Sequence, residues 1–333
     1  MIKHSRSLIA ACLSAFVVLL SACAPTPPSL TSTSIQLSWE HTIEFSGFQM
    51  AEREGYYAEQ GLVTELRPAF SAEGSITDAV DAVITGKADF GIASNDSLMK
   101  LQAAGAPVVA IAAIYQRSPN ALMSLAESNI TRPEDLKGKT ITVSGTSRIY
   151  YLNSLLHNAG IDLADLNIVD RTDFSTDELT SGKVDALDTF ITNEPAVLEE
   201  EGYAYNLIIY ADYGVDGYVN VIFASQDTIN KRPELVEAFL RATLKGYQAA
   251  VDDPEKAAAL SVEYNSNLSY ETELTNMLVS VPLLHPNGSQ IGMMTSEIWD
   301  LGSQLMREAG ELSDEFDVTR SYTLDFLNKI YNP

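Results

Sequence analysis

Cysteine is scarce in this chain, which has Cys12 and Cys23 among its 333 residues. Two cysteines allow at most one disulfide and cannot form a cysteine-rich metal site. Histidine is also rare, and the four histidines, at positions 4, 41, 157 and 285, form no cluster with metal-ligand spacing. These shortages exclude a disulfide framework, and we expect no metal centre and no cofactor.

Basic residues are also scarce relative to acidic ones. The chain has 21 Lys and Arg residues against 45 Asp and Glu residues, which gives a formal net charge of −24. A surface of this sign repels phosphate backbones and anionic lipid headgroups. The composition therefore excludes nucleic acid as a partner, although charge alone identifies no ligand.

The chain has one long hydrophobic run, from Leu8 to Leu20. This run is too short to span a bilayer. Two basic residues precede it, and it closes on Leu20-Ser21-Ala22-Cys23, a pattern typical of a bacterial lipoprotein processing site. We therefore predict that residues 1–22 are a lipoprotein signal peptide and that Cys23 becomes the lipidated first residue. The mature chain would be anchored to the cell membrane on its extracytoplasmic side. The alternative is an ordinary secretory signal with a chance cysteine at its end.

A segment poor in large apolar residues follows the cysteine. Residues 23–34 are rich in Pro, Ser and Thr, so they can bury little surface and are expected to stay extended. We predict a flexible tether over 23–34 and a folded part from about residue 35 to residue 333. That length is enough for two lobes, each with its own core.

The folded part alternates short apolar strands with amphipathic helices, which predicts an α/β fold with parallel sheets covered on both faces. Strands are expected at 35–39, 62–66, 89–93, 108–114, 121–125, 140–143, 168–169, 186–190, 207–210 and 219–224. Helices are expected at 45–55, 75–85, 96–104 and 150–159, with a helical turn at 133–136 and a mostly helical tail from Pro233.

Two segments echo each other, Thr85-Gly86-Lys87-Ala88-Asp89 and Ser181-Gly182-Lys183-Val184-Asp185. Each ends a predicted helix and opens a predicted strand, so each glycine is expected to have a positive φ at a helix C-terminus. The echo predicts two similar lobes. We assign residues 35–117 plus 224–333 to the first lobe and residues 118–223 to the second, with crossings near 116–120 and 218–224.

Four ordered motifs carry a family resemblance: Glu54 to Leu62 (EGYYAEQGL), Gly86 to Ala93 (GKADFGIA), Leu136 to Lys139 (LKGK) and Thr192 to Pro195 (TNEP). Together they resemble the solute-binding proteins of ABC importers for thiamine-precursor pyrimidines, riboflavin and alkylsulfonates. The resemblance implies a bilobal type II periplasmic-binding-protein fold that closes on a small molecule. It also implies delivery to a membrane permease and its ATPase.

The ligand is expected at the C-terminal ends of the strands, where open α/β sheets place their binding crevices. Aromatic rings there could stack on a heteroaromatic ligand while acids and amides bond its polar edge. The residues predicted to bind ligand are Trp39, His41, Phe45, Asn95, Asp96, Tyr115, Ser147, Tyr150, Asn193 and Glu194. Tyr56 and Tyr57 are interpreted as scaffold, and Trp39 and Tyr115 as rings that face each other.

The supply of aromatic and acidic residues favours riboflavin as the ligand, followed by the formylated aminopyrimidine precursor of thiamine. Anions such as alkylsulfonates are disfavoured because Arg117 and Arg148 are the basic candidates near the expected cleft. A sensor domain that presents solute to a membrane kinase would use the same fold.

An enzyme is a further alternative, since a synthase of the thiamine pyrimidine resembles these binding proteins. The chain lacks the cysteine-rich iron run of that enzyme, and His41 stands alone. We therefore predict binding without chemistry.

Overall fold

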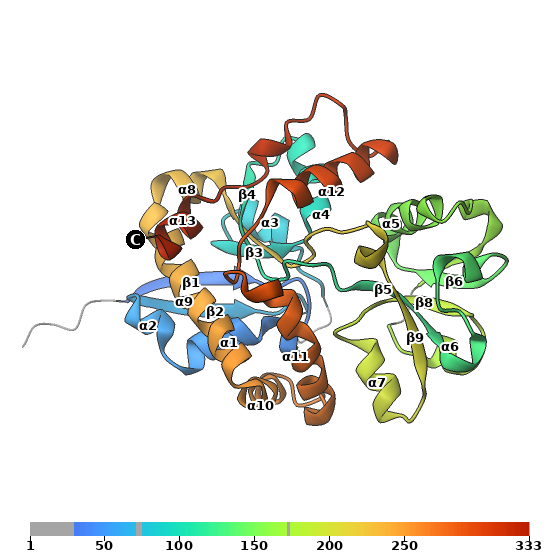
Figure 1. The fold of residues 1–333 in the computed structure, drawn as a ribbon. Coiled ribbons are helices and arrows are strands. Elements are labelled where there is room, and N and C mark those ends of the chain that lie inside the picture. The colour runs from blue at the N-terminus through green and yellow to red at the C-terminus, as the bar shows by residue number, and fades with distance from the viewer. Residues whose placement is uncertain (1–29, 71–74, 172–173, 333) are drawn as a thin grey trace, which may run out of the picture.

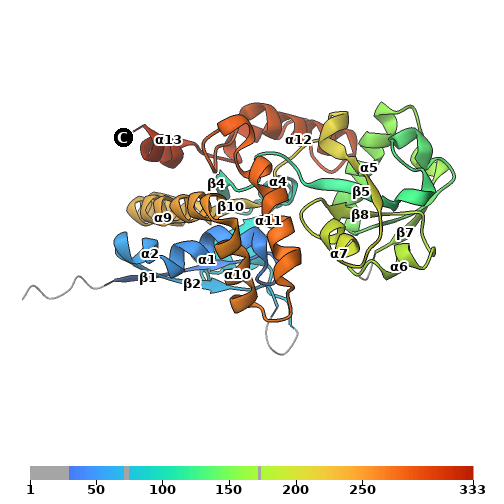
Figure 2. The same ribbon diagram turned by 60° about the horizontal axis from the view of Figure 1, so that its bottom comes forward.

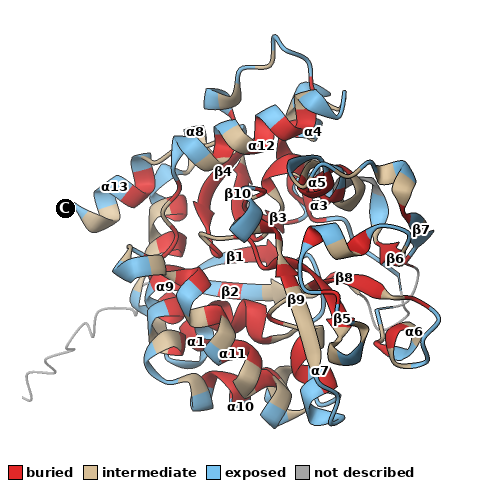
Figure 3. Ribbon diagram, turned by 45° about the vertical axis from the view of Figure 1, so that its right-hand side comes forward, coloured by how far each residue is buried: buried red, intermediate tan, exposed pale blue. Residues whose placement is uncertain are grey.

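The computed structural model describes residues 30–332 apart from 71–74 and 172–173, without the side chains of residues 146–147. Two α/β lobes lie side by side (Figure 1), and each is built around a five-stranded sheet. Buried residues are concentrated in the strands and on the helix faces turned toward them (Figure 3). Cys23 and the predicted signal peptide lie outside the described residues.

The first sheet has the strand order β2-β1-β3-β10-β4. Its strands are β1 (Thr31–Gln36), β2 (Leu62–Arg67), β3 (Phe90–Ala93), β4 (Val108–Ala113) and β10 (Val221–Ser225).

The second sheet has the order β7-β6-β8-β5-β9. Its strands are β5 (Asn120–Leu125), β6 (Thr140–Val143), β7 (Asn167–Asp170), β8 (Ala186–Phe190) and β9 (Tyr205–Ile209).

The two sheets repeat one topology. In the first, β1 lies parallel between β2 and β3, and β10 runs antiparallel between β3 and β4. In the second, β6 lies parallel between β7 and β8, and β5 runs antiparallel between β8 and β9. The prediction of two similar lobes is therefore confirmed, but each sheet is mixed and not purely parallel. The antiparallel strand is in each case the one that the chain enters directly from the other lobe.

The echoed segments have the same role in both lobes. Gly86 and Gly182 have φ values of 71° and 72°, as the helix-end interpretation requires. The aspartate that follows each glycine then accepts a hydrogen bond from a backbone amide of the neighbouring strand. Asp89 accepts from Ser34 at 3.1 Å, and Asp185 accepts from Thr140 at 2.8 Å. These turns hold the strand order together and are scaffold.

Helices flank both sheets (Figure 2). Those connecting strands within the lobes are α1 (Ser46–Arg53), α2 (Tyr56–Glu59), α3 (Ala79–Ile84), α4 (Asn95–Ala103), α5 (Gly145–Asn158), α6 (Asp177–Thr180) and α7 (Glu194–Glu200). Those after β10 are α8 (Gln226–Lys231), α9 (Pro233–Asp252), α10 (Pro254–Tyr264), α11 (Tyr270–Leu284), α12 (Ser296–Glu308) and α13 (Asp325–Tyr331).

The C-terminal helices complete the first lobe, as predicted for the tail. Phe239 of α9 stacks on Phe90 of β3 with ring centroids 3.9 Å apart. Gly246 of α9 sits where a Cβ atom would lie 2.0 Å from the carbonyl oxygen of Gly47 in α1. Only glycine therefore allows α9 to approach α1 this closely. Within the described residues, none of the helices is both long and apolar enough to cross a membrane.

Three predicted boundaries need correction. The tether ends earlier than residue 34, because Thr31 to Ser34 already pair with β2. Residues 221–223 were assigned to the second lobe, but they belong to β10, which pairs with β3 and β4 of the first. Helix α5 begins at Gly145 instead of Tyr150, and a positive φ of 70° at that glycine lets the chain turn directly from β6 into the helix.

Candidate functional site

A cavity of about 870 Å³ lies between the two lobes. Its lining comes largely from residues that follow parallel strands, including Trp39 after β1, Ser94 after β3, Ser144 after β6 and Arg171 after β7. The carboxyl ends of both sheets therefore face one cavity, which is where open α/β sheets place ligands. Its volume lies within the range of roughly 300 to 1,000 Å³ that small-molecule sites occupy.

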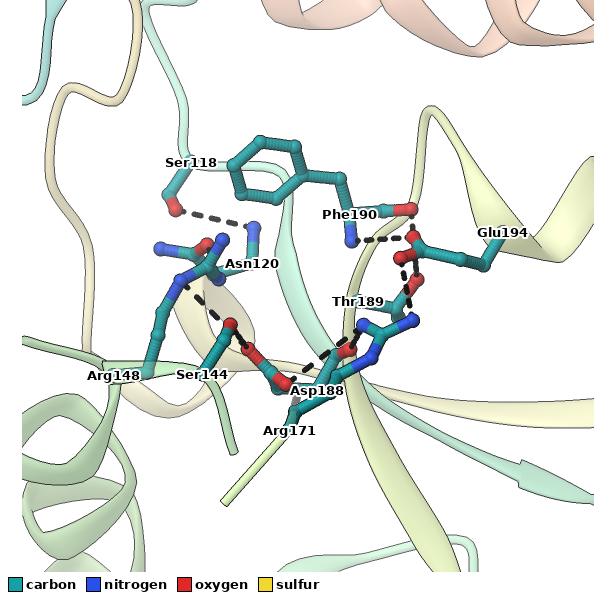
Figure 4. Close-up of polar contacts among 9 residues, drawn as sticks. All are labelled: Ser118, Asn120, Ser144, Arg148, Arg171, Asp188, Thr189, Phe190 and Glu194. Atoms are coloured by element: carbon teal, nitrogen blue, oxygen red, sulfur yellow. Dashed lines mark hydrogen bonds and ion pairs between the residues drawn. The ribbon is translucent and has the colours of Figure 1, made fainter. Parts of the chain in front are cut away.

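The wall from the second lobe is a network of buried charges (Figure 4). Arg171 Nη2 lies 3.0 Å from Glu194 Oε1, and Arg171 Nη1 lies 3.8 Å from Asp188 Oδ1. Glu194 Oε2 also accepts hydrogen bonds from Thr189 Oγ1 at 2.6 Å and from the Phe190 amide at 3.3 Å. Arg171 is buried, so these carboxylates neutralise its charge where water cannot.

A second arginine extends this network toward the crossing between the lobes. Arg148 of α5 donates a hydrogen bond to Asn120 Oδ1, and its Nε lies 3.8 Å from Asp188 Oδ2. The same carboxylate oxygen accepts from Ser144 Oγ at 2.8 Å. The guanidinium carbon lies 4.5 Å from the centroid of the Phe190 ring, which is cation–π geometry. Arg148 is thus held on three sides before any ligand arrives.

Aromatic rings from both lobes meet at the outer part of the cavity. Trp39 contacts Phe70 edge-on with centroids 4.8 Å apart, and it contacts Phe174 of the second lobe at 5.3 Å. Arg171 lies over the Phe174 ring at 5.1 Å. Trp39 and Phe174 are 39% and 50% exposed, so both keep apolar surface available to a ligand.

The wall from the first lobe carries buried carboxyl groups. Burial raises the pKa of Glu44 to about 7, and the carboxylates of Glu273 and Glu194 add to the shift while Asn220 and Arg148 oppose it. Burial likewise raises the pKa of Glu273 to about 7, against a hydrogen bond of 2.7 Å from the Ile43 amide. Near neutral pH, both carboxyl groups are therefore protonated in a large fraction of molecules.

The charges of the lining are unbalanced. The described lining contains the carboxyl groups of Glu44, Asp78, Asp96, Asp188, Glu194 and Glu273 and the guanidinium groups of Arg148 and Arg171. Both guanidinium groups are already paired with carboxylates. An anionic ligand would therefore meet no uncommitted cation among these residues and would face several acids.

The lobes touch on both sides of the cavity. Tyr150 of α5 donates a hydrogen bond of 2.6 Å to Asp96 of α4. On the other side, Ser269 at the start of α11 donates to Glu200 of α7 at 3.1 Å, and Thr272 also bonds this carboxylate. These contacts hold the lobes around the cavity and would be broken by hinge opening.

Some of the predicted binding residues line the cavity, and others lie outside it. The cavity is lined by Trp39, Asp96, Asn193 and Glu194, and Tyr150 supports it through its bond to Asp96. Four others are outside the lining: His41, Phe45, Asn95 and Tyr115. The side chain of Ser147 lies outside the described part of the structure.

The predicted pairing of Trp39 with Tyr115 is not formed. Tyr115 is fully buried, and its hydroxyl lies 3.0 Å from Ser280 Oγ of α11, so the C-terminal helices cover it. Phe45 is likewise buried and packs on Phe48. The ring that contacts Trp39 across the cavity is Phe174.

His41 and Asn95 also differ from prediction. The His41 ring packs against Tyr264, and burial lowers its pKa. Asn95 is fully buried beneath Gly217 and Gly302, neither of which lines the cavity. Tyr57 bonds Thr243 in the core and Tyr56 packs under Lys245, both outside the cavity, in agreement with a scaffold role.

Several lining residues were missed by sequence reasoning. Arg171 lies two residues after the expected strand at 168–169, so its position just beyond a strand end was an available signal. Glu44 stands between two apolar residues, which is unusual for an exposed acid. Glu273 lies in α11, and no local pattern connects that helix with the strand ends. Arg117, a predicted basic candidate, pairs with Asp212 outside the cavity.

Comparison with known proteins gives a consistent result. The family described as NMT1/THI5 like matches residues 42–257. Riboflavin-binding protein RibY of Chloroflexus aurantiacus is 27% identical over 93% of this chain and 95% of its own. The formylaminopyrimidine-binding protein of Halalkalibacterium halodurans is 26% identical over 85% and 88%. A 4-amino-5-hydroxymethyl-2-methylpyrimidine phosphate synthase of Legionella pneumophila is 24% identical over 88% and 92%.

Among solved structures, a putative periplasmic sulfonate-binding protein SsuA of Methylobacillus flagellatus superposes with a TM-score of 0.68 at 18% identity, covering 91% of this chain and 94% of that one. This likeness concerns the fold and agrees with the two repeated lobes. The family match covers more than half of the chain. The chain therefore belongs to the NMT1/THI5-like family and has the bilobal periplasmic-binding-protein fold.

Proposed function

We propose that this protein is a lipid-anchored, extracytoplasmic receptor that captures riboflavin and delivers it to the permease and ATPase of an ABC importer. The observation that carries the proposal is the cavity between the lobes, which combines apolar rings at its outer part with acids and amides inside. A heteroaromatic ring can stack on Trp39 and Phe174 while its polar edge bonds the second-lobe network.

The size of the cavity favours riboflavin over a single pyrimidine ring. A volume of about 870 Å³ lies near the upper end of the range for small-molecule sites. A lone pyrimidine would leave much of this space to water, whereas a tricyclic flavin with its side chain would contact both walls. The similarity to RibY along nearly the whole chain supports the same ligand.

The formylated aminopyrimidine is the second candidate. Glu194 is fixed by Arg171 and Thr189, and such a carboxylate could accept hydrogen bonds from an exocyclic amine and a ring nitrogen. The formylaminopyrimidine-binding relative supports this alternative.

Alkylsulfonates rank below both heteroaromatic ligands. Each lining arginine is paired with a carboxylate, and releasing one for a sulfonate would leave that carboxylate buried without its partner. A sensor domain would bind the same solute, so the choice between transport and sensing depends on the membrane partner and not on the cavity.

Binding without chemistry is preferred over the synthase reaction. The two relatives with the greater identity are named as binding proteins, and the synthase of Legionella pneumophila is less similar.

The ligand is tested by calorimetry of the purified protein with riboflavin, with the formylated aminopyrimidine and with an alkylsulfonate. We expect saturable one-to-one binding of riboflavin. Tight pyrimidine binding without flavin binding would replace riboflavin by the second candidate, and tight sulfonate binding would contradict both.

The anchor is tested separately in the native host. We expect mass spectrometry of the membrane fraction to find the chain beginning at a diacylated Cys23, and globomycin to block its maturation. Unmodified Cys23, or processing that is insensitive to globomycin, would contradict anchoring while leaving the ligand proposal in place.

A further inference from the structure

The N-termini of several helices lie at the wall of the cavity. The lining includes residues from the N-caps or first turns of α3, α4, α5, α7 and α11. The first backbone amides of a helix have no partner within the helix, and the helix dipole adds positive potential there. Such positions favour the binding of anions. On backbone geometry alone, this cavity would therefore suit a phosphate or sulfonate group.

Acids of the protein itself already stand at four of these helix ends. Asp78 is the N-cap of α3, and its carboxylate accepts a hydrogen bond of 2.9 Å from a backbone amide of the first turn. Asp96, Glu194 and Glu273 lie in the first turns of α4, α7 and α11. All four acids are in the lining of the cavity. An incoming anion would therefore be placed next to an acid at each of these helix ends.

The other positive features of the lining are paired with carboxylates. Ser144, the N-cap of α5, donates a hydrogen bond of 2.8 Å to Asp188. Arg148 Nε lies 3.8 Å from Asp188 Oδ2, and Arg171 Nη2 lies 3.0 Å from Glu194 Oε1. Over the part of the lining that the structure describes, no further basic side chain is present. A ligand phosphate would have to take a cation away from a carboxylate that needs it.

A phosphate ester of a flavin would meet these acids with its full charge. A phosphomonoester carries roughly −1.5 to −2 charges near neutral pH. The acids of the lining come from both lobes, and they include the exposed Asp78 as well as the buried Glu44. Like charges brought together in a binding site oppose association. The uncharged vitamin avoids this repulsion.

From these observations we infer that the cavity selects the phosphate-free vitamin and rejects its phosphate ester, with Asp78 and Glu194 as specificity-determining residues. The inference rests on the proposed function and deepens it. Flavin phosphates outside the cell would then reach this receptor only after a phosphatase has acted. That reaction uses water to break the ester bond and releases riboflavin and inorganic phosphate.

The test compares riboflavin with flavin mononucleotide, its phosphate ester, by calorimetry of the purified full chain at low ionic strength. We expect riboflavin to bind more tightly by roughly 100-fold or more. A phosphate ester that binds as tightly as riboflavin would overturn the inference and leave riboflavin binding intact. Binding of neither flavin would instead overturn the proposed function, so the two failures are distinguishable.

Two isosteric variants then assign the residues. Asp78→Asn removes a charge but keeps a side chain that caps helices well. Glu194→Gln removes a charge and releases Arg171 from its nearest carboxylate. We expect each variant to lower the ratio of riboflavin affinity to flavin mononucleotide affinity roughly 3- to 10-fold, as for removal of one nearby like charge. The ratio is the readout because a general loss of folding or stacking affects both flavins equally.

Matched controls carry the same changes outside the cavity. Asp253 is the N-cap of α10 and accepts a hydrogen bond of 3.1 Å from the Lys256 amide, and Glu199 is an exposed residue of α7. Asp253→Asn and Glu199→Gln should keep the wild-type ratio. An unchanged ratio in both Asp78→Asn and Glu194→Gln would contradict the assignment. An equal fall in the controls would also contradict it, because the net charge of the chain would then explain the rejection.

Discussion

The two walls of the cavity differ in how they accommodate buried ionisable groups. On the second lobe, Arg171, Asp188 and Glu194 bring opposite charges together within 3.0 to 3.8 Å. On the first lobe, Glu44 and Glu273 form no ion pair with any described residue, and burial raises the pKa of each to about 7. One wall pairs its buried charges with one another, and the other buries carboxyl groups that are largely neutral near neutral pH.

This difference indicates that the two walls have different roles in ligand binding. A wall whose charges are paired in advance keeps its geometry when the lobes open, so it can orient the edge of a ligand without reorganisation. A wall whose carboxyl groups are largely protonated near neutral pH adds little negative charge, so a neutral ligand can approach it at low electrostatic cost.

The largest effect is expected from Arg171→Met. This change leaves Asp188 and Glu194 buried without their partner, and breaking a buried pair costs about 3 to 5 kcal/mol. We expect a marked drop in the free energy of unfolding, measured by urea denaturation, together with loss of ligand binding. Arg117→Met is the control, because Arg117 pairs with Asp212 on the surface and should change stability little. Equal stability of the two variants would contradict the role of the paired wall.

The next effect concerns the pH dependence of the ligand-free protein. A carboxyl group whose pKa is raised by folding stabilises the fold fully below its unfolded pKa of 4.5, and this contribution is lost as the pH rises through about 7. Wild-type protein should therefore lose stability between about pH 5 and pH 8. Glu44→Gln should remove part of that slope, up to about 3 kcal/mol for the shift of one group.

The measurement is the melting temperature of both proteins across this pH range. His41, whose pKa is lowered by burial, contributes with the opposite sign as its unfolded form loses a proton, but it is present in both proteins. The difference between them therefore isolates Glu44. Parallel curves would show that the Glu44 carboxyl does not titrate as its environment indicates.

A smaller effect is expected from Trp39→Ala. Trp39 is partly exposed and makes edge contacts with Phe70 and Phe174, so its removal should leave stability nearly unchanged. Loss of stacking on a bound ring should weaken riboflavin binding by about 1 kcal/mol beyond the lost burial. Calorimetry and thermal melting separate the two effects. A normal affinity would place the ring of the ligand elsewhere in the cavity.

The smallest effect is expected from Glu200→Ala, which removes the contact of α7 with Ser269 and Thr272. These groups are at the surface, so the closed form should lose about 0.5 kcal/mol, or roughly a twofold faster dissociation of ligand. Stopped-flow release measurements test this. A much larger change would mean that this contact, and not the cavity, controls closure.

Local sequence patterns predicted most of the fold. The strands at 140–143 and 186–190 are observed with the predicted bounds, because short apolar runs there are flanked by turns and polar residues. The antiparallel placement of β5 and β10 was not predictable in the same way. Strand direction depends on which lobe the chain comes from, and periodicity carries no information about that. Helix α7 was not predicted either, and its Pro195 occupies the first turn, where proline is tolerated.

The site was less predictable than the fold. Trp39, Asp96 and Glu194 could be placed because each lies at or just beyond a strand end. Tyr115 occupies a similar position in sequence, but its hydroxyl bonds Ser280 of α11, far along the chain. Glu273 and Asn276 enter the cavity from the same C-terminal helix. A residue buried or exposed by a distant helix cannot be assigned from its neighbours in sequence.

The central claim is that riboflavin binds between the lobes with its ring against Trp39. Flavin emission is quenched by direct contact with an indole ring, so titration of riboflavin fluorescence with the purified protein tests the claim directly. The account predicts saturable quenching at one-to-one stoichiometry that is largely lost in Trp39→Ala. Unchanged riboflavin emission at saturating protein, with the formylated aminopyrimidine binding to the same preparation, would contradict it.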